Sequence, residues 1–173
     1  MNEHSHLVIA DDNHNIKNLE LGAGCGGFGR KFYPLCYTTD LSKPLLEEDC
    51  EHPIQYQCNA YELPWGESRF DKVIMANPYG YGFNDKEVAE RLLSELGRVI
   101  INGGEILVVG SNLNRFVNKI KVFVREGLVL GNVTFTYQLE EIDASVVYNG
   151  HIFRSITGDE VKPTLKYIIN VSK

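Results

Sequence analysis

The sequence predicts a single α/β domain built on a doubly wound, mostly parallel sheet, and three observations lead to this fold class. Short apolar segments alternate with helix-forming segments over most of the chain, which is typical of a parallel sheet covered by helices. A glycine-rich turn, Gly22 to Gly27, follows the first apolar segment. The chain has 173 residues, 43% of them apolar, so it can form one core of ordinary size but is too short for a second large domain.

The first half of the domain is expected to contain four strands. They are strand one at 18–21, strand two at 35–39, strand three at 54–58 and strand four at 72–76. A short helix, 27–33, follows the glycine-rich turn and is stopped by Pro34, while Asp40 closes strand two. Ser42 is expected to cap a second helix that reaches about Cys50.

The second half begins with the longest predicted helix. It starts at Asn84 or Asp85 and extends to about Ile100, because its apolar residues recur at helical spacing, and the stretch 102–104 (Asn-Gly-Gly) breaks it. Strand five at 105–109, a helix from 114 to about 126, strand six at 133–138 and a final strand at 165–171 complete a sheet of seven strands. Between the last two strands, Tyr148-Asn-Gly-His151 indicates a small hairpin.

Composition excludes several functional classes. Residues 1–17 are mostly polar, with one apolar patch at 7–10, and are expected to form a flexible N-terminal arm before a domain at 18–173. No apolar run approaches the roughly 20 residues of a membrane span, and no secretory leader is visible, so a cytoplasmic protein with reduced thiols is expected. The formal charge of −6 argues against a nucleic-acid partner. The four cysteines show no metal-ligand spacing, so no metal is expected.

The residues before and within the glycine-rich turn indicate a nucleotide-like ligand. Gly22, Gly24 and Gly26 allow a sharp turn and a close approach of the backbone to a ligand. Gly22, Gly24 and Gly27 also fit the G-x-G-x-x-G spacing of a dinucleotide loop, so two cofactor classes compete. Glu20 favours a cationic ligand such as S-adenosylmethionine over a pyrophosphate.

Further polar residues follow the other predicted strands. Asp40 ends strand two, Asn59 and Ala60 follow strand three, and Asn77 and Tyr79 flank Pro78 after strand four. Ligands of open parallel sheets bind outside the carboxyl ends of the strands, so these residues are expected in one crevice. Each also has a structural alternative: Asp40 as a helix cap, Asn59 as a turn former, and Pro78 as a strand stop.

Taken together, these residues resemble the class I (Rossmann-like) S-adenosylmethionine-dependent methyltransferases. The segment 20–26 (Glu-Leu-Gly-Ala-Gly-Cys-Gly) resembles the first motif of that superfamily, and Asp40 the second. The segments 59–65 and 69–73 are similar to its aspartate-alanine, leucine-proline-aromatic and phenylalanine-aspartate-x-valine stretch, with Asn59 in place of the usual aspartate. The segment 93–108 resembles its helix-turn-strand signature. The resemblance covers about residues 18–110 and implies an antiparallel last strand.

The resemblance also implies roles for individual residues. Glu20 and the backbone of Gly22, Ala23, Gly24 and Gly26 would hold the methionine portion of the cofactor, Asp40 with Leu41 the ribose, and Asn59 with Ala60 the adenine. Asn77 would face the sulfonium methyl. The segment 77–79 (Asn-Pro-Tyr) resembles the asparagine-proline-proline-tyrosine motif of methyltransferases that act on planar nitrogens, with one proline missing. This makes Asn77 and Tyr79 the candidate catalytic residues and nitrogen one candidate acceptor atom.

The leading hypothesis is therefore an S-adenosylmethionine-dependent methyltransferase acting on a small molecule or a protein. The alternative is a binding or interaction module that keeps the fold without turnover. A nicotinamide-dependent oxidoreductase would require a substrate domain that the length does not allow. The long connection before the last strand is expected to overhang the pocket, and a second copy or a partner protein is a candidate to complete it.

Overall fold

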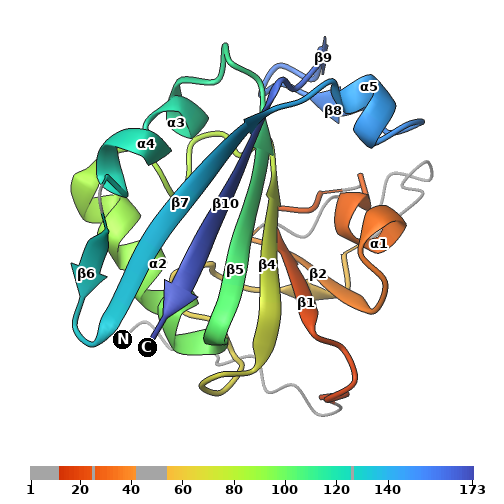
Figure 1. The fold of residues 1–173 in the computed structure, drawn as a ribbon. Helices are drawn as coiled ribbons and strands as arrows, with labels where there is room; N and C mark the ends of the chain where they lie inside the picture. The colour runs from red at the N-terminus through yellow and green to blue at the C-terminus, as the bar shows by residue number, and fades with distance from the viewer. Residues whose placement is uncertain (1–11, 25, 42–53, 126) are drawn as a thin grey trace, which may run out of the picture.

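The computed structural model describes residues 12–24, 26–41, 54–125 and 127–173 (Figure 1). The main sheet has eight strands in the order β3-β2-β1-β4-β5-β10-β7-β6. Its strands are β1 (Asn18–Leu21), β2 (Cys36–Asp40), β3 (Tyr56–Gln57), β4 (Phe70–Ala76), β5 (Ile100–Gly110), β6 (Leu128–Leu130), β7 (Val133–Glu141) and β10 (Leu165–Ser172). A separate two-stranded sheet pairs β8 (Phe153–Arg154) with β9 (Glu160–Val161).

The predicted fold class is confirmed. β3, β2, β1, β4 and β5 pair in parallel, whereas β10 is antiparallel to both β5 and β7. The predicted count of seven strands is wrong by one, because β6 forms an antiparallel hairpin with β7. The two-residue turn between them is Gly131-Asn132, and a Gly-Asn pair between two strands is a known sequence signal for a hairpin. In the structure Gly131 adopts the positive φ, 61°, that such a turn requires.

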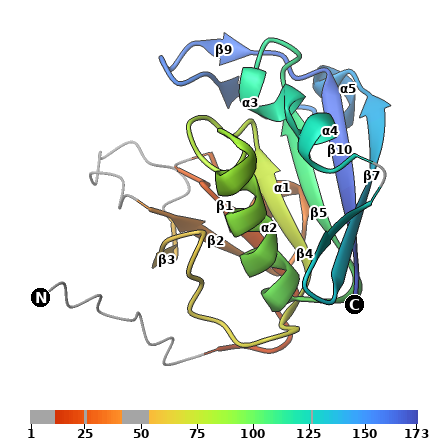
Figure 2. The same cartoon turned by 90° about the vertical axis from the view of Figure 1, so that its left-hand side faces the viewer.

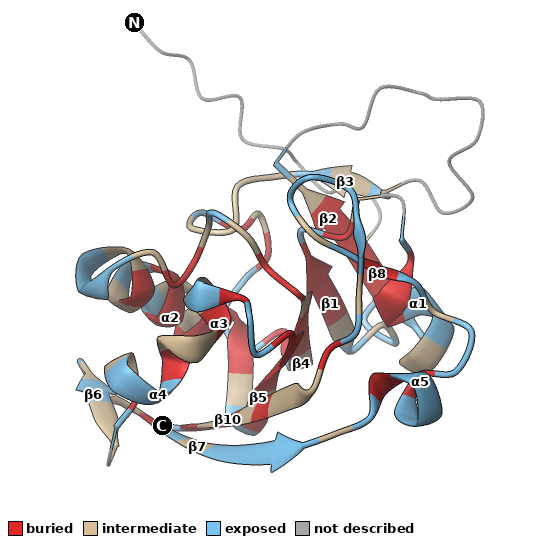
Figure 3. Ribbon diagram, turned by 90° about the horizontal axis from the view of Figure 1, so that it is seen from above, coloured by how far each residue is buried: buried red, intermediate tan, exposed pale blue. Residues whose placement is uncertain are grey.

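Helices cover the two faces of the sheet unequally. α2 (Lys86–Val99), α3 (Arg115–Asn118) and α4 (Ile120–Phe123) lie on one face, and α1 (Phe28–Phe32) and α5 (Ala144–Val147) lie on the other (Figure 2). Alternation along β4 divides the core accordingly: Val73 and Met75 pack in the cluster that contains α2, and Ile74 packs in the cluster that contains Phe28. The buried strands β1 and β4 thus form the centre of the molecule (Figure 3).

α2 forms as the sequence predicts. Asp85 caps it, its carboxylate accepting a hydrogen bond from the Val88 backbone N–H at 2.9 Å. The apolar face of the helix, which includes Leu92, Leu93 and Leu96, is completely buried against the sheet. Burial of this stripe, more than helix propensity, stabilises the helix in place.

β5 starts earlier than predicted, directly at the end of α2. Ile100 pairs with Phe70, and the next paired residue, Glu105, lies opposite Lys72, so the Asn102-Gly103-Gly104 segment forms an irregularity inside the strand. A Cβ on Gly104 would lie 2.7 Å from the Asp71 carbonyl oxygen. The glycine pair therefore distorts the strand instead of separating it from the helix.

A small hairpin precedes the last strand, as predicted, but its position was wrong. α5 occupies the residues expected to form its first arm, and the hairpin is instead β8–β9 with its turn at 155–159. The reason is tertiary: Tyr148 is buried, packs 4.8 Å from the Phe28 ring centroid, and shares a hydrogen bond with the Tyr33 hydroxyl at 3.1 Å. Tyr148-Asn-Gly-His151 still forms a turn, closed by a hydrogen bond from the His151 N–H to the Tyr148 carbonyl.

Other boundaries also differ from the prediction. The expected helix over 114–126 is two short helices, α3 and α4, and the third strand has only two residues. Residues 12–17 of the expected N-terminal arm are held by Arg69, which contacts the Asp12 carboxylate and donates to the Asn13 and Ile16 carbonyls. The expected helix from Ser42 to Cys50 lies outside the described residues.

Candidate functional site

The glycine-rich loop joins β1 to α1 at the carboxyl edge of the sheet. Gly22 and Gly24 adopt positive φ values of 62° and 51°, which a residue with a side chain rarely adopts. The Ala23 N–H donates to the Thr39 carbonyl, which ties the loop to β2. A Cβ on Gly24 would meet no atom within 4 Å, so this part of the loop backbone faces open space. Ala23 and Gly26 complete the described loop.

Glu20 lies at the base of this loop and is 1% exposed. Its Oε2 accepts a hydrogen bond from the Gly29 N–H at 2.8 Å. Burial raises the pKa of Glu20 to about 7, the Gly29 N–H counteracts that rise, and the nearby Asp40 carboxylate adds to it. The carboxyl group is thus held in place by the first turn of α1 and changes charge near neutral pH.

Asp40 ends β2 opposite the loop, where its Oδ2 accepts a hydrogen bond from the Gly24 N–H at 3.0 Å. Leu41 follows and is 67% exposed. Asn59 lies across the same depression and forms a turn, with its Oδ1 accepting from the Tyr61 N–H at 2.9 Å. The structure therefore brings Asp40, Leu41, Asn59 and Ala60 together along one cavity.

That first cavity has a volume of about 410 Å³ and extends from the ends of β2 and β3 to the loop after β4. A second cavity, of about 630 Å³, lies between the glycine-rich loop and residues 150–155. The two cavities share Gly22, Ala76 and Asn77 in their walls. Together they form a continuous lining across the switch in strand order between β1 and β4, where α/β proteins bind ligands.

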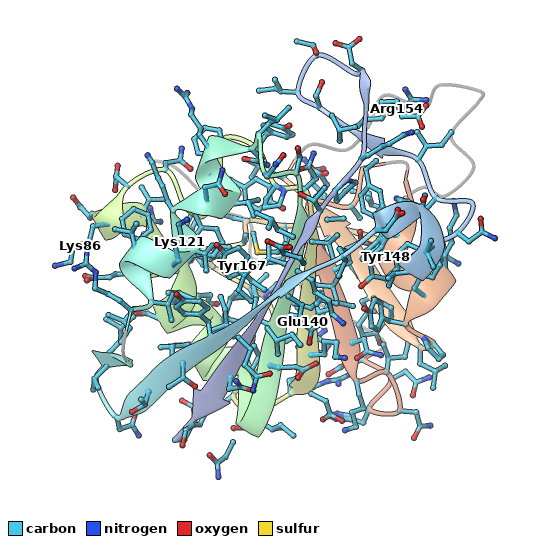
Figure 4. All side chains as sticks on the ribbon, turned by 45° about the horizontal axis from the view of Figure 1, so that its top comes forward. Lys86, Lys121, Glu140, Tyr148, Arg154 and Tyr167 are labelled. Carbon is cyan, nitrogen blue, oxygen red and sulfur yellow. The ribbon has the colours of Figure 1, made fainter. Side chains whose placement is uncertain are left out.

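The roof of the second cavity is the connection between β7 and β10, as the sequence led us to expect. His151 and Phe153 pack on Phe28 of α1, with ring centroids 5.2 and 5.3 Å apart. Figure 4 shows Tyr148 and Arg154 on this side of the molecule and Lys86 and Lys121 on the other. The connection thus encloses the loop with aromatic side chains.

Asn77 is buried at the end of β4 and adopts a positive φ of 47°. Its Oδ1 accepts hydrogen bonds from the Ser111 N–H at 3.2 Å and from Asn114 Nδ2 at 3.0 Å, and its Nδ2 donates to the Arg154 carbonyl at 3.1 Å. Both ends of the amide are therefore used within the protein. In this arrangement Asn77 joins the ends of β4 and β5 to the β8–β9 hairpin, and its catalytic role stays a prediction.

The two tyrosines after β4 have different surroundings. Tyr79 lines the first cavity and packs edge-on against Phe116 of α3, with ring centroids 6.5 Å apart. Tyr81 also lines the first cavity, but its hydroxyl donates to the Leu21 carbonyl at 3.1 Å, beside the glycine-rich loop.

Some lining residues carried no distinctive signal in the sequence. Tyr61 and Cys58 belong to the first cavity, and Phe28, Lys31 and Arg154 to the second. The length of the connection before the last strand predicted an overhang, but the side chains it would contribute could not be read from the sequence. Within the described ranges no group of three or more His, Cys, Asp or Glu residues could hold a metal ion.

No helix among the described residues is long and apolar enough to cross a membrane. No protein-family model matches this sequence, and no curated protein matches it either.

Solved structures do match the fold. An S-adenosylmethionine-dependent methyltransferase from Archaeoglobus fulgidus matches 90% of this chain and 86% of its own, with 13% identity and a TM-score of 0.55. An antibiotic-related methyltransferase matches 93% of this chain and 95% of its own, with 13% identity and a TM-score of 0.53. Phosphoethanolamine N-methyltransferase 1 of Haemonchus contortus, in complex with phosphoethanolamine and S-adenosylhomocysteine, matches 90% of this chain at 12% identity and a TM-score of 0.54.

The present chain spans only 39% of the length of that nematode enzyme. These likenesses show that the protein has the fold of the class I S-adenosylmethionine-dependent methyltransferases.

Proposed function

We propose that the protein is a methyltransferase that uses S-adenosylmethionine. The observation that carries this proposal is the meeting of two carboxyl groups on one glycine-rich loop. Glu20 and Asp40 come from neighbouring strands, and each accepts a hydrogen bond from a backbone N–H within or just after that loop. A loop lined by carboxyl groups suits a ligand with ammonium and sulfonium cations and is a poor site for a pyrophosphate.

The residues present fit this cofactor. The backbone of Gly24 faces open space, and the two cavities that meet at Gly22 have the size of ordinary ligand pockets. The first cavity contains Asp40 and Asn59, the residues proposed for ribose and adenine, and the second contains Glu20 and the loop proposed for the methionine portion. When bound, the cofactor supplies a methyl group on a good sulfur leaving group.

The protein's own contribution is alignment and exclusion of water. Asp40 would fix one end of the ligand, and Glu20 would bind its ammonium group. The roof formed by His151 and Phe153 shields the second cavity, and the Asn77 amide ties this roof to the ends of β4 and β5. An acceptor reaching the second cavity would meet the cofactor in a partly enclosed, aromatic space.

The acceptor is proposed to be a small molecule or a protein. A nitrogen acceptor is the variant that the Asn77-Pro-Tyr79 segment suggests. The proposal includes a cytoplasmic location, which the free thiols of Cys36 and Cys58 support. It also includes a second copy or a partner protein as the element that completes the pocket.

One observation favours a second candidate, a cofactor-binding module without turnover. The Asn77 side-chain oxygen, which would accept a hydrogen bond from an attacking nitrogen, already accepts two from Ser111 and Asn114. Incubating the protein and a cell extract with S-adenosylmethionine labelled in its methyl group separates the two candidates. Label in an acceptor that requires the intact protein supports the enzyme; binding without label transfer supports the module.

The proposed cofactor itself is tested by calorimetric titration with S-adenosylhomocysteine and, separately, with NAD. Micromolar binding of S-adenosylhomocysteine alone is the expected result. Binding of NAD alone would identify a dinucleotide site and contradict the proposal, and binding of neither ligand would contradict it as well.

A further inference from the structure

The turn between α5 and β8 contains an Asn-Gly pair, Asn149-Gly150, that the proposed function does not use. Both residues are exposed. Within the described part of the chain, neither the Asn149 side chain nor the Gly150 N–H makes a hydrogen bond. A Cβ on Gly150 would meet no atom within 4 Å, so the backbone nitrogen and the neighbouring side chain have open space around them.

An asparagine before a glycine loses its side-chain amide in water without an enzyme. The Gly150 nitrogen gives its proton to hydroxide and attacks Cγ of Asn149, and Nδ2 takes up a proton from water and leaves as ammonia. The product is a five-membered succinimide, and the missing Cβ of glycine leaves the attack unobstructed. Water then breaks one of the two ring C–N bonds. The result is aspartate or isoaspartate, and in isoaspartate the backbone runs through the former side chain and is one carbon longer.

The chain contains one other Asn-Gly pair, Asn102-Gly103, which provides an internal comparison. This pair lies inside β5, and Asn102 Oδ1 accepts a hydrogen bond from the Lys173 N–H at 2.9 Å. An amide held in this way has to break that bond before it can turn toward the next nitrogen. The fold thus distinguishes two pairs that have the same local sequence.

The residues on either side of Asn149-Gly150 are fixed by packing in the roof of the second cavity. Tyr148 is buried, and its hydroxyl shares a hydrogen bond with the Tyr33 hydroxyl at 3.1 Å. The His151 ring lies 4.6 Å from the Phe153 ring centroid, and its residue lines the cavity together with Gly150. The His151 N–H closes the turn by donating to the Tyr148 carbonyl at 3.1 Å.

We propose that Asn149 is a site of spontaneous deamidation and that its isoaspartyl product distorts the roof of the second cavity. The extra backbone carbon lies between Tyr148 and His151, inside the turn that their hydrogen bond closes. The two residues therefore cannot both keep their present positions. The aspartyl product adds a charge at an exposed position but leaves the backbone length unchanged.

The first test incubates the folded protein at pH 8 and follows both Asn-Gly pairs by mass spectrometry of their peptides. Conversion at Asn149 is expected to be at least tenfold faster than at Asn102, and in urea the two rates should become similar. Equal rates in the folded protein, or an intact Asn149 while the unfolded chain is converted, overturn the assignment of the site.

The second test isolates the isoaspartyl protein by ion-exchange chromatography and measures hydrogen exchange of the His151 N–H. Exchange should be at least tenfold faster than in fresh protein, because the turn no longer closes. Incubated Asn149→Gln is the matched control, and Asn149→Asp separates the charge from the extra carbon; both should keep the original rate. An unchanged rate in the isoaspartyl protein overturns the effect on the roof.

One consequence rests on the proposed function. Since the roof covers the second cavity, the isoaspartyl protein should bind S-adenosylhomocysteine at least threefold more weakly than fresh protein in calorimetry, and equal affinity overturns this consequence. The proposed function fails separately, when fresh protein binds no S-adenosylhomocysteine, and the two tests without ligand still decide the modification.

Discussion

Glu20 and Asp40 lie on neighbouring strands, with Thr38, two residues before Asp40, as the register partner of Glu20, but only Glu20 is fully buried. Its raised pKa, about 7, follows from desolvation, which the single hydrogen bond from Gly29 compensates only in part. A buried acid of this kind is costly to ionise in the unliganded protein and becomes useful when a cation binds beside it. Glu20, the residue proposed to bind the ammonium group of the ligand, therefore destabilises the free protein above neutral pH.

The pH dependence of stability follows from the direction of this shift. In the unfolded chain Glu20 loses its proton near pH 4.5, and in the folded protein near pH 7. Between these values the folded state binds more protons, so the contribution of Glu20 to stability is full below pH 4.5 and is lost as the pH rises through 7. Glu20→Gln removes this loss. The free energy of unfolding of the variant minus that of the unmodified protein, measured in urea, should therefore increase by on the order of 3 kcal/mol from pH 4 to pH 8. A constant difference across this range would contradict the assigned pKa.

Ligand binding should show the opposite dependence on pH. Ionised Glu20 attracts the ammonium group of S-adenosylhomocysteine, so the affinity of the unmodified protein should rise from pH 6 to pH 8. In Glu20→Gln this rise should disappear and the affinity at pH 8 should be lower. Calorimetric titrations at pH 6, 7 and 8 check both, and equal slopes for the two proteins would show that Glu20 does not contact the ligand's charge.

Asp40 allows a simpler test. A carboxylate that hydrogen-bonds ribose hydroxyls contributes about 1.5 to 3 kcal/mol, so Asp40→Ala should weaken S-adenosylhomocysteine binding by roughly tenfold to a hundredfold. Asp71→Ala, at an exposed position near the start of β4, is the matched control and should leave the affinity unchanged. Unchanged affinity in Asp40→Ala would remove Asp40 from the site.

At the scale of single residues, the sequence predicted those site residues whose position depends on where a strand ends. Glu20, Asp40, Asn59 and Asn77 all lie at or just after the ends of parallel strands, because short apolar runs followed by glycine or polar residues mark those ends in the sequence. The partners of their side chains were beyond prediction. The hydrogen bond from Asn77 to Arg154 joins residues 77 positions apart, and no local pattern encodes such a contact.

At the scale of elements, local signals succeeded where tertiary contacts agreed with them. The Asp85 cap and the apolar stripe predicted α2 correctly. Asn149-Gly150 forms a turn but no hairpin, because Tyr148 packs on Phe28 and Phe32 instead of lying in a β-strand. Gly131-Asn132 carried an equally good signal that the prediction overlooked, and β6 and β7 pair around it. The side chains that decide between such turns lie in other elements.

The irregular start of β5 supplies a test at this scale. A Cβ on Gly104 would lie 2.7 Å from the Asp71 carbonyl oxygen and 2.5 Å from Ile100 Cγ2, and the backbone oxygen cannot move without disturbing β4. Gly104→Ala should therefore lower the free energy of unfolding by about 1 to 3 kcal/mol. Gly66→Ala, where a Cβ would meet nothing within 4 Å, should change it little. Equal unfolding midpoints in urea would show that the strand relaxes around the new methyl group.

At the scale of the whole molecule, the strands whose ends form the site are the most deeply buried part of the sheet. β1 and β4 are buried at its centre, whereas the residues of β7 from Gln138 to Glu141 are exposed (Figure 3). Lys166 on β10 and Glu140 opposite it on β7 form an ion pair on that open side, 3.7 Å apart. Polar residues thus allow part of the sheet to face water without a covering helix.

The arrangement of strands also explains why the site has two connected cavities. Strand order reverses between β1 and β4, the connections after these strands leave toward opposite faces, and the opening between them is where Gly22 and Asn77 meet. The alternation of strands and helices in the sequence predicts this opening. Its roof, the β7–β10 connection, depends on packing among Phe28, Tyr148 and Phe153, which the pattern alone does not contain.

The most direct test of the central claim is a crystal structure of the protein with S-adenosylhomocysteine. Electron density is expected to run through both cavities, with the ribose hydroxyls on Asp40 and the amino group of the homocysteine on the Glu20 side of the glycine-rich loop. Density for the ligand at any other place, or its absence at a concentration that saturates the protein in solution, would show that Glu20 and Asp40 do not form the cofactor site.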